Sequence, residues 1–398
     1  MFKKFKITAF GCPMQKSDAE RIAFFMESLG LKETKDENEA DILIYCMCSV
    51  RQSAVDRIYG ILKKLPKDKL KILAGCILEK DKKVFEKYFD FIWQARPLFH
   101  LPPKPSSKEA YIQIATGCNY RCSYCVVPLV RGREILRKKD EILKEAKDFI
   151  KKGYKMLWLV APRVTCHPQL KELIEEIENF KENFWLGITA PHPADFKDDL
   201  IKTLAKSKKI IPHLSLPLQS ASNKILKKMR RNYKKEDFEK TVKKLKEAFQ
   251  KERKGPESHL SLSTDIIVGF PGETKKDFEE TLNFLKKTRF EMAYIAEYSP
   301  RPGTEAFSFK ETVSQKEKAK RRKILEKILQ EIAFEENKKF LGKEIEVFVR
   351  KKRKNFFLGK SRHQKTVKFK AENNENLLGK IVKVKIKNIK DFGLEGEI

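Results

Sequence analysis

Three cysteines with the spacing Cys-x3-Cys-x2-Cys constrain this chain more than any other feature. Cys118, Cys122 and Cys125 follow an apolar, strand-like run at residues 111–115. Three thiolates on one tight loop can bind three irons of a cubane iron–sulfur cluster and leave the fourth iron open to a small molecule. A structural zinc site, the alternative, needs four ligands and usually two paired cysteine motifs. Because no cysteine or histidine closely follows Cys125, the spacing favours the cluster.

A longer run around these cysteines resembles a known family. It is Gly117-Cys118-Asn119-Tyr120-Arg121-Cys122-Ser123-Tyr124-Cys125-Val126-Val127-Pro128-Leu129-Val130-Arg131-Gly132-Arg133-Glu134. The three cysteines resemble the signature of the radical S-adenosylmethionine (SAM) superfamily. The whole run resembles the methylthiotransferases of that superfamily, and among them the MiaB-like enzymes that modify tRNA.

Length and charge set broader limits. A chain of 398 residues is long for one domain and predicts two or three. It carries 86 lysines and arginines against 55 aspartates and glutamates, a net charge of +31. Such an excess predicts a polyanionic partner, most simply nucleic acid. The alternative is a set of solvated, lysine-rich helix faces.

The sequence also indicates a compartment. No run of about 18 apolar residues is present, so we expect no transmembrane helix and no membrane partner. The N-terminus enters a strand directly and lacks the apolar segment of a signal peptide. Eight cysteines are too few for a disulfide scaffold in a chain of this length. We therefore expect a cytoplasmic protein.

The first 96 residues predict a parallel α/β domain. Strand-like runs at residues 5–11, 41–45 and 71–74 alternate with helical runs. Cys12, Cys48 and Cys76 each follow one of these strands closely. The carboxyl ends of parallel strands gather at one edge of a sheet, so these thiols should converge and could hold a second cluster. Three separate buried thiols are the alternative.

The same segments resemble the N-terminal domain of the methylthiotransferases, whose three cysteines hold a second [4Fe–4S] cluster. Two departures are visible: Gln15 stands where the family usually has Asn, and Cys46-Met47 replaces Asn-Thr before the second cysteine. We expect Cys48 to be the ligand and Cys46 to serve in packing. Residues 97–109 are proline-rich and predict a linker.

Residues 110–340 predict a second domain in which strands and helices alternate. The strand-like runs are residues 111–115, 156–160, 185–189, 213–218, 260–268 and 292–298. Six repeats are too few for an eight-fold barrel but fit the open six-strand, TIM-like (β/α)6 barrel of radical SAM enzymes. In such barrels the chemistry lies in loops at the carboxyl ends of the strands. A long charged helix at residues 314–340 ends this domain.

Those loops supply the candidate SAM-binding residues. The resemblance assigns this role to Gln219 and Ser220, which follow the fourth strand, and to Asp265, Gly269 and Glu273 around a Gly-Phe-Pro-Gly turn. Arg301 lies in the run Tyr298-Ser299-Pro300-Arg301-Pro302-Gly303-Thr304, which matches the family almost letter for letter. A plain strand–turn–helix is the simpler interpretation of the Gly-Phe-Pro-Gly motif.

Two further segments bear on the substrate. Pro191-His192-Pro193 resembles the tRNA-modifying branch rather than the branch that modifies a ribosomal protein, and we assign His192 no catalytic role. The family commonly has Gly-Gln-Asn-Val-Asn-Ser-Tyr where residues 161–167 read Ala-Pro-Arg-Val-Thr-Cys-His. Arg163 could replace the missing amides in binding a phosphate or carboxylate. Cys166 and His167 are too few ligands for a metal site.

Residues 341–398 change character. Alternating runs at 345–349, 366–369 and 381–386 predict a small β-barrel. Residues 343–398 contain 16 lysines and arginines against 7 aspartates and glutamates, a net charge of +9. A small basic barrel is a common RNA-binding module. This tail resembles a TRAM domain; a lid packed on the SAM domain is the alternative.

The resemblance implies two [4Fe–4S] clusters, SAM as cofactor and tRNA as partner. The enzyme would form a 5′-deoxyadenosyl radical and methylthiolate carbon 2 of N6-isopentenyladenosine beside the anticodon, with no catalytic side chains beyond the clusters. It would be a monomer that receives electrons from a donor such as flavodoxin or ferredoxin; the sulfur source stays open. Three alternatives remain: action on N6-threonylcarbamoyladenosine in tRNA, methylthiolation of a ribosomal-protein aspartate, and a non-catalytic, metal-dependent RNA-binding protein.

Overall fold

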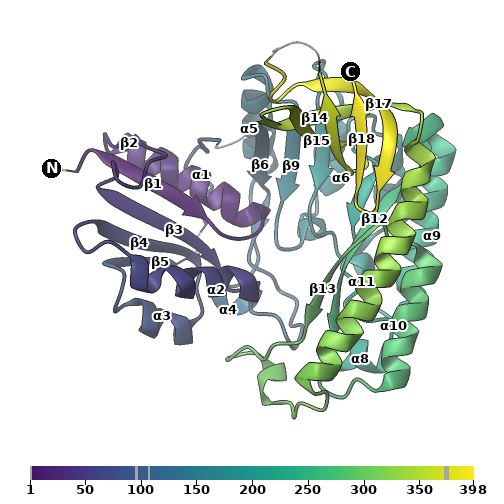
Figure 1. Ribbon diagram of the computed structural model, residues 1–398, viewed down its shortest axis with the longest axis horizontal. Helices are drawn as coiled ribbons and strands as arrows, with labels where there is room; N and C mark the ends of the chain where they lie inside the picture. Colours follow the sequence, from purple (N-terminus) through teal and green to yellow (C-terminus); the bar gives the residue numbers. More distant parts are fainter. Residues whose placement is uncertain (1, 95–96, 106–107, 372–375) are drawn as a thin grey trace.

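The computed structural model describes residues 2–94, 97–105, 108–371 and 376–398, and within them the chain forms three units (Figure 1). Parts of the predicted linker and tail, at residues 106–107 and 372–375, lie outside this range. The first unit is a five-stranded parallel sheet with the order β2-β1-β3-β4-β5. Its strands are β1 (Lys4–Ala9), β2 (Lys32–Glu33), β3 (Ile42–Cys48), β4 (Leu70–Cys76) and β5 (Phe91–Gln94).

Helices cover both faces of this sheet, and the central strand β3 shows why. All seven of its residues are buried, as expected for a strand packed on both sides. Ile42, Ile44 and Cys46 pack with residues of α1 (Pro13–Ser28). Leu43, Tyr45 and Met47 face the opposite layer, which contains α2 (Gln52–Ile61) and α3 (Glu79–Phe85). The predicted α/β domain is confirmed.

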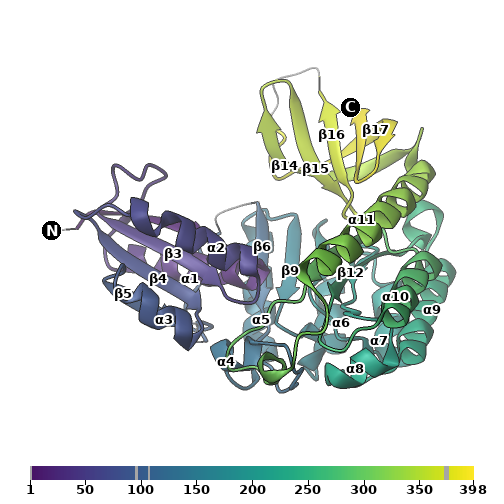
Figure 2. The ribbon, with the colours of Figure 1, turned by 60° about the horizontal axis from the view of Figure 1, so that its bottom comes forward.

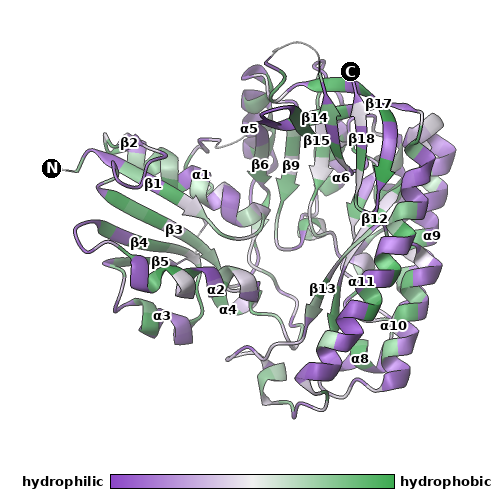
Figure 3. Ribbon diagram, in the orientation of Figure 1, coloured by the Kyte–Doolittle hydropathy of each residue, from purple (hydrophilic) through white to green (hydrophobic). Residues whose placement is uncertain are grey.

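The middle unit contains the six predicted parallel strands. One sheet holds β6 (Glu109–Gln113), β9 (Met156–Val160) and β10 (Trp185–Ile188), and the other holds β11 (His213–Ser215), β12 (Ser261–Val268) and β13 (Met292–Glu297). A parallel bridge between Leu186 and Ile210 links the two sheets into one open barrel. The apolar strands and the polar outer faces of the helices are visible in Figure 3.

Helices alternate with these strands and form the outer layer. They are α5 (Lys139–Lys151), α6 (Leu170–Glu178), α7 (Asp198–Lys206), α9 (Lys235–Glu252) and α10 (Lys275–Thr288). Two short helices were not predicted: α4 (Val127–Arg131) and α8 (Asn223–Lys228). Both have at most six residues, too few for hydrophobic periodicity to identify them.

The C-terminal unit is a closed barrel of five strands, which confirms the predicted small β-barrel (Figure 2). It follows α11 (Gln315–Asn337), which runs along the second sheet, and its strand order is β14-β15-β16-β18-β17. The strands are β14 (Glu344–Arg353), β15 (Phe356–Ser361), β16 (Thr366–Lys370), β17 (Ile381–Lys390) and β18 (Gly393–Glu397). Strands β15 and β18 were not among the three predicted runs; on the buried face of β15, Gly359 and Ser361 follow Phe357, so its apolar alternation is short.

This barrel packs on the amino-terminal end of the six-strand barrel. Arg350 forms an ion pair with Glu109 at the start of β6, and Phe348 contacts the ring of Trp185 on β10. The basic barrel therefore lies at the end of the six-strand barrel opposite the cysteine loop, which follows β6 and β7 (Ala115–Thr116). Among the described residues, no helix has the length and apolar character needed to cross a membrane.

Candidate functional site

The structure brings the three N-terminal cysteines together. Cys12 is the N-cap of α1, directly after β1, while Cys48 and Cys76 are the last residues of β3 and β4. The latter two are paired in the parallel ladder. The Cys48 thiol lies close enough to those of Cys12 and Cys76 for each to affect the pKa of its neighbour. Convergence at the carboxyl edge of the sheet is thus observed, as the strand-end positions predicted.

Two glycines create the space beside these thiols. A Cβ atom at Gly11 would lie 2.7 Å from the Cβ of Cys48, and a Cβ at Gly75 would overlap the side-chain amide of Gln15. Gly75 also has a positive φ of 110°, a backbone conformation that residues with a Cβ atom rarely adopt. The site therefore requires glycine at Gly75 for two independent reasons, one of backbone conformation and one of volume.

Arg131 completes the site from the neighbouring domain. Its Nε donates to the Sγ of Cys76 at 2.9 Å and its Nη2 donates to the Oε1 of Gln15 at 2.8 Å. The guanidinium also pairs with the Oδ2 of Asp18 at 2.5 Å. The neighbouring Cys48 thiol, together with the cation of Arg131, lowers the pKa of the Cys76 thiol. Cys76 is therefore the thiol best prepared to act as a thiolate.

The residues present fit an iron–sulfur cluster. The Nε2 of Gln15 is buried and has no hydrogen-bond partner among the described residues. It could therefore donate a hydrogen bond to a sulfide or a thiolate of a bound cluster. Four sulfurs around zinc lie about 3.8 Å apart. In the described part of the chain, neither cysteine trio has all three sulfurs within 4.8 Å of one another. A single ion bound by all three thiols of either trio would therefore require the sulfurs to move closer together.

Cys46 packs in the core, as predicted. It is fully buried among Phe5, Ile22 and Ala74, and burial raises the pKa of its thiol far above the usual range. Residues two apart on a strand share a face, so strand alternation does not distinguish Cys46 from Cys48. The distinction comes from position along β3, because Cys48 ends the strand and Cys46 lies one pleat further in.

The second trio lies on the loop between β7 and α4. Backbone hydrogen bonds fix this loop to distant segments: Ser123 N donates to Met229 O at 3.0 Å, and Ala306 N donates to Ser123 O at 2.7 Å. The Sγ of Cys122 accepts from Nη1 of Arg231 at 3.7 Å. Burial raises the pKa of Cys125 to about 12. All three cysteines are partly exposed.

Arg163, from the altered loop, contacts residues of the cysteine loop and of the segment that follows it, and we call this set of contacts the Arg163 clasp. Its guanidinium pairs with Glu134 at 2.9 Å and with Asp195 at 2.8 Å, and lies 4.1 Å from the ring centre of Tyr120. The Tyr120 hydroxyl donates to Asp195 at 2.8 Å. Arg163 therefore binds carboxylates of this chain itself. His167 is also structural, with its Nε2 2.9 Å from the Arg137 carbonyl oxygen.

Two of the predicted SAM-binding residues are joined through their backbones near the second trio. Gln219 N donates to Asp265 O at 2.7 Å, and Gln219 has a positive φ of 68°. The Asp265 carboxyl is partly buried, and burial raises its pKa despite the nearby cations of Arg51 and Arg231. The second of these arginines is the donor to Cys122, which places Asp265 close to the cysteine loop.

The other candidates have partners elsewhere in the fold. The Ser220 hydroxyl lies 3.4 Å from that of Thr281 on α10. Glu273 accepts from the backbone N–H of Gly269 at 3.0 Å and pairs with Arg321 of α11 at 2.5 Å. A Cβ atom at Gly269 would overlap the Lys318 side chain. These contacts brace the turn after β12.

The N-terminal unit touches the mouth of the barrel through the loop and helix that follow β3. Arg51 lies over the ring of Tyr294 at 5.6 Å, and Arg301 donates to Gln52 at 2.5 Å. The sixth SAM-binding candidate, Arg301, therefore lies at the junction between the units. Val126 and Val130 of the second trio's segment also pack against Cys76 and Leu78. The two cysteine sites are adjacent across this junction.

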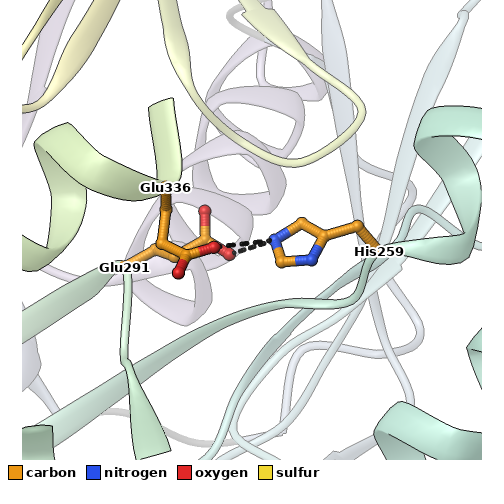
Figure 4. Close-up of side chains that lie close together, drawn as sticks. All are labelled: His259, Glu291 and Glu336. Carbon is orange, nitrogen blue, oxygen red and sulfur yellow. Dashed lines mark hydrogen bonds and ion pairs between the residues drawn. The ribbon is translucent and has the colours of Figure 1, made fainter. Parts of the chain in front are cut away.

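A third cluster of potential ligands lies far from the cysteines. Figure 4 shows His259 pointing at Glu291 and Glu336, with its Nε2 2.8 Å and 3.7 Å from their oxygens. Lys365 pairs with Glu291 at 2.5 Å, Arg289 pairs with Glu336 at 2.5 Å, and Lys339 also pairs with Glu336. Because these cations already neutralise both carboxylates, the group is an ion-pair network that ties the C-terminal barrel to the core.

Sequence reasoning missed the donors to the thiols. Arg131 lies within the family-like run, but its partners Asp18 and Cys76 are 113 and 55 residues away. Arg231 similarly reaches Cys122 over 109 residues. No periodicity or spacing connects such pairs, so the sequence alone contains no signal for them.

Two family models match the chain. The Radical SAM superfamily matches residues 112–285, and the Uncharacterized protein family UPF0004 matches residues 4–93. The radical SAM methyltransferase TsrM from Kitasatospora setae, solved with cobalamin and a [4Fe–4S] cluster, has a TM-score of 0.57 and 12% identity, and covers 77% of each chain. At that identity the likeness shows the fold.

Full-length relatives are more specific. A tRNA-2-methylthio-N(6)-dimethylallyladenosine synthase of Carboxydothermus hydrogenoformans is 35% identical over 99% of both chains. The corresponding protein of Acetivibrio thermocellus is 34% identical over 100% of this chain and 91% of its own.

Proposed function

The chain belongs to the radical SAM methylthiotransferases that include these synthases, and from that membership we propose that it methylthiolates carbon 2 of N6-dimethylallyladenosine, the isopentenyladenosine named above, in tRNA. The observation that carries the proposal is the pair of adjacent cysteine trios, in a chain that matches the relatives over its whole length. The position beside the anticodon and a cytoplasmic location belong to the same proposal.

In this proposal each trio holds one [4Fe–4S] cluster. Cys118, Cys122 and Cys125 would ligate the cluster that binds SAM, and the thiols of β1, β3 and β4 would ligate the second. When bound, these groups supply the electron transfer, the radical and the sulfur chemistry that amino-acid side chains cannot perform. The electrons would come from a donor such as flavodoxin or ferredoxin.

The chain's own residues position the reactants. Asp265 offers a partly buried carboxylate close to the cysteine loop, where it would attract the cationic groups of SAM, and Gln219 lies beside it. We also assign SAM contacts to Ser220, Gly269, Glu273 and Arg301, each of which also has a contact within this chain. A substrate base must be unstacked to reach the space between the trios.

The basic C-terminal barrel would bind tRNA. Its excess of positive charge suits the phosphate backbone, and its ion pairs to the core, such as Arg350 with Glu109, hold it in a fixed orientation. We therefore expect tRNA affinity to fall steeply as the salt concentration rises. We propose domain limits of 1–96, 110–340 and 341–398, joined by the linker at 97–109.

Nucleoside mass spectrometry of tRNA tests the proposal. A bacterial strain that lacks the 2-methylthio modification is complemented with this chain, with Cys48→Ala and with Cys122→Ala. We expect the native chain to restore the 2-methylthio mark on N6-dimethylallyladenosine and both variants to fail. A mark on N6-threonylcarbamoyladenosine instead would contradict the choice of nucleoside. A chain that restores no mark, although it is expressed and carries iron, would contradict the activity.

A further inference from the structure

Arg131 donates a hydrogen bond to a thiol of the N-terminal trio from the other domain. Among the described residues it is the one side chain that does so. It ends α4, six residues after Cys125, and crosses the domain junction to reach Cys76. The side chains of Arg131 and its partner Asp18 are 4% and 5% exposed. A buried arginine with a buried carboxylate beside a thiol is costly to desolvate, so this arrangement calls for a function beyond packing.

We propose that Arg131 and Asp18 together set the reduction potential of the cluster held by Cys12, Cys48 and Cys76. This inference rests on the proposed function, because it requires a cluster at that trio. One-electron reduction adds a negative charge to the cluster and its thiolates. A cation and an N–H donor at a ligand sulfur stabilise that charge and raise the potential. Arg131 supplies both at Cys76.

Asp18 acts in the opposite sense. Its carboxylate offsets the charge of Arg131, so it should lower the potential that the arginine raises. It is also held in place by Gln113, whose Nε2 donates to Asp18 Oδ1 at 2.7 Å. The two residues are thus predicted to shift the potential in opposite directions when each is neutralised. General damage to the site would shift both variants in the same direction.

The test is a redox titration with dithionite in the presence of mediator dyes, followed by electron paramagnetic resonance. It is done on the full chain carrying Cys118→Ala, Cys122→Ala and Cys125→Ala, so that one cluster gives the signal. We expect Arg131→Gln to lower the midpoint potential and Asp18→Asn to raise it. The expected change is tenfold in the reduction equilibrium, about 59 mV for one electron. Arg131→Lys, which keeps the charge, should shift it less.

Arg137→Gln is the matched control. Arg137 is also a buried arginine, 6% exposed, and it pairs with Glu145 at 2.8 Å. It contacts no cysteine among the described residues, so its loss should leave the potential unchanged. If Arg131→Gln does not retain a cluster, Arg131→Lys and Asp18→Asn provide the same test through their opposite shifts.

The outcomes separate the two levels of the proposal. A parent triple variant that binds no cluster after reconstitution would overturn the proposed cluster site, and the inference with it. A parent that binds its cluster, with a potential that Arg131→Gln and Asp18→Asn leave unchanged or move in the same direction, would overturn the inference alone. Opposite shifts with an unmoved Arg137→Gln control would support it.

Discussion

The two cysteine trios are built in opposite ways. Cys118, Cys122 and Cys125 lie on one loop of eight residues and are partly exposed. Cys12, Cys48 and Cys76 come from three strand ends, and the last two are at most 1% exposed. The first site is local and open, which suits an iron that must admit SAM. The second site is assembled by the fold and enclosed, so the charge and the hydrogen bonds at its thiols depend on the residues packed around it.

Each trio nevertheless receives an arginine donor from a distant segment. Arg231 reaches Cys122 and Arg131 reaches Cys76, at donor–sulfur distances of 3.7 Å and 2.9 Å. The shorter bond belongs to the enclosed site, where the guanidinium is also paired with Asp18. The comparison teaches that the spacing of cysteines in the sequence is enough to identify the open site. The surroundings of the enclosed site come from tertiary contacts, which the spacing does not reveal.

The largest expected effect separates the roles of the trios. Cys122→Ala should abolish cleavage of SAM to 5′-deoxyadenosine, because it removes a ligand of the SAM-binding cluster. Cys48→Ala should retain SAM cleavage and lose methylthiolation of tRNA. Anaerobic assays with product analysis by mass spectrometry measure both. Equal loss of SAM cleavage in the two variants would contradict the assignment of SAM binding to the open site alone.

Removal of the Arg163 clasp should damage the open site selectively. Arg163→Leu leaves the carboxylates of Glu134 and Asp195 without their cation, which should cost about 3 kcal/mol of folding free energy. In a Cys48→Ala background we expect it to reduce the iron bound at the remaining trio. Iron analysis and urea denaturation measure the two effects.

Arg322→Leu is the control for Arg163→Leu. Its side chain is 41% exposed and pairs with Glu297 at 3.4 Å, so its loss should cost less than about 1 kcal/mol. Retention of full iron and stability in Arg163→Leu would show that the loop around Tyr120 is ordered without the clasp.

Acid should lower the folding stability of the domain that holds the open site more than that of residues 1–96. Burial, with the nearby Arg231 cation, lowers the pKa of His192 to about 3, whereas residues 1–96 contain no histidine. Between pH 6.5 and about 3 the unfolded chain binds a proton at this residue that the folded chain does not, so stability falls as the pH falls. The loss is about 1.4 kcal/mol per pH unit. Thermal unfolding of the native chain and His192→Gln at pH 7 and pH 5 measures it; an equal loss in both would contradict this origin.

The smallest expected effect concerns the spare thiol. Cys46→Ala should keep the full iron content and lose about 1 kcal/mol of stability, since it removes one buried sulfur from the core. Iron analysis and denaturation of Cys46→Ala and Cys48→Ala measure the difference. Loss of a cluster in Cys46→Ala would show that the ligand was wrongly chosen.

The sequence was informative where local pattern determines structure. Strand alternation and the strand-end positions of Cys12, Cys48 and Cys76 predicted the three units and the convergence of the thiols. The helices and strands that were missed, among them α3, α4, α8, β5, β15 and β18, have at most seven residues each, too few for hydrophobic periodicity to identify them. The buried network around Arg131 was also missed, because it joins residues more than 50 positions apart.

Iron content with Mössbauer spectroscopy on anaerobically reconstituted protein tests the central claim most directly. We predict about eight irons per chain in the native protein and about four in both Cys48→Ala and Cys122→Ala, as expected for two independent cubane clusters. Added SAM should perturb the spectrum of Cys48→Ala and leave that of Cys122→Ala unchanged. About four irons in the native chain, or bound zinc in place of iron, would contradict the account.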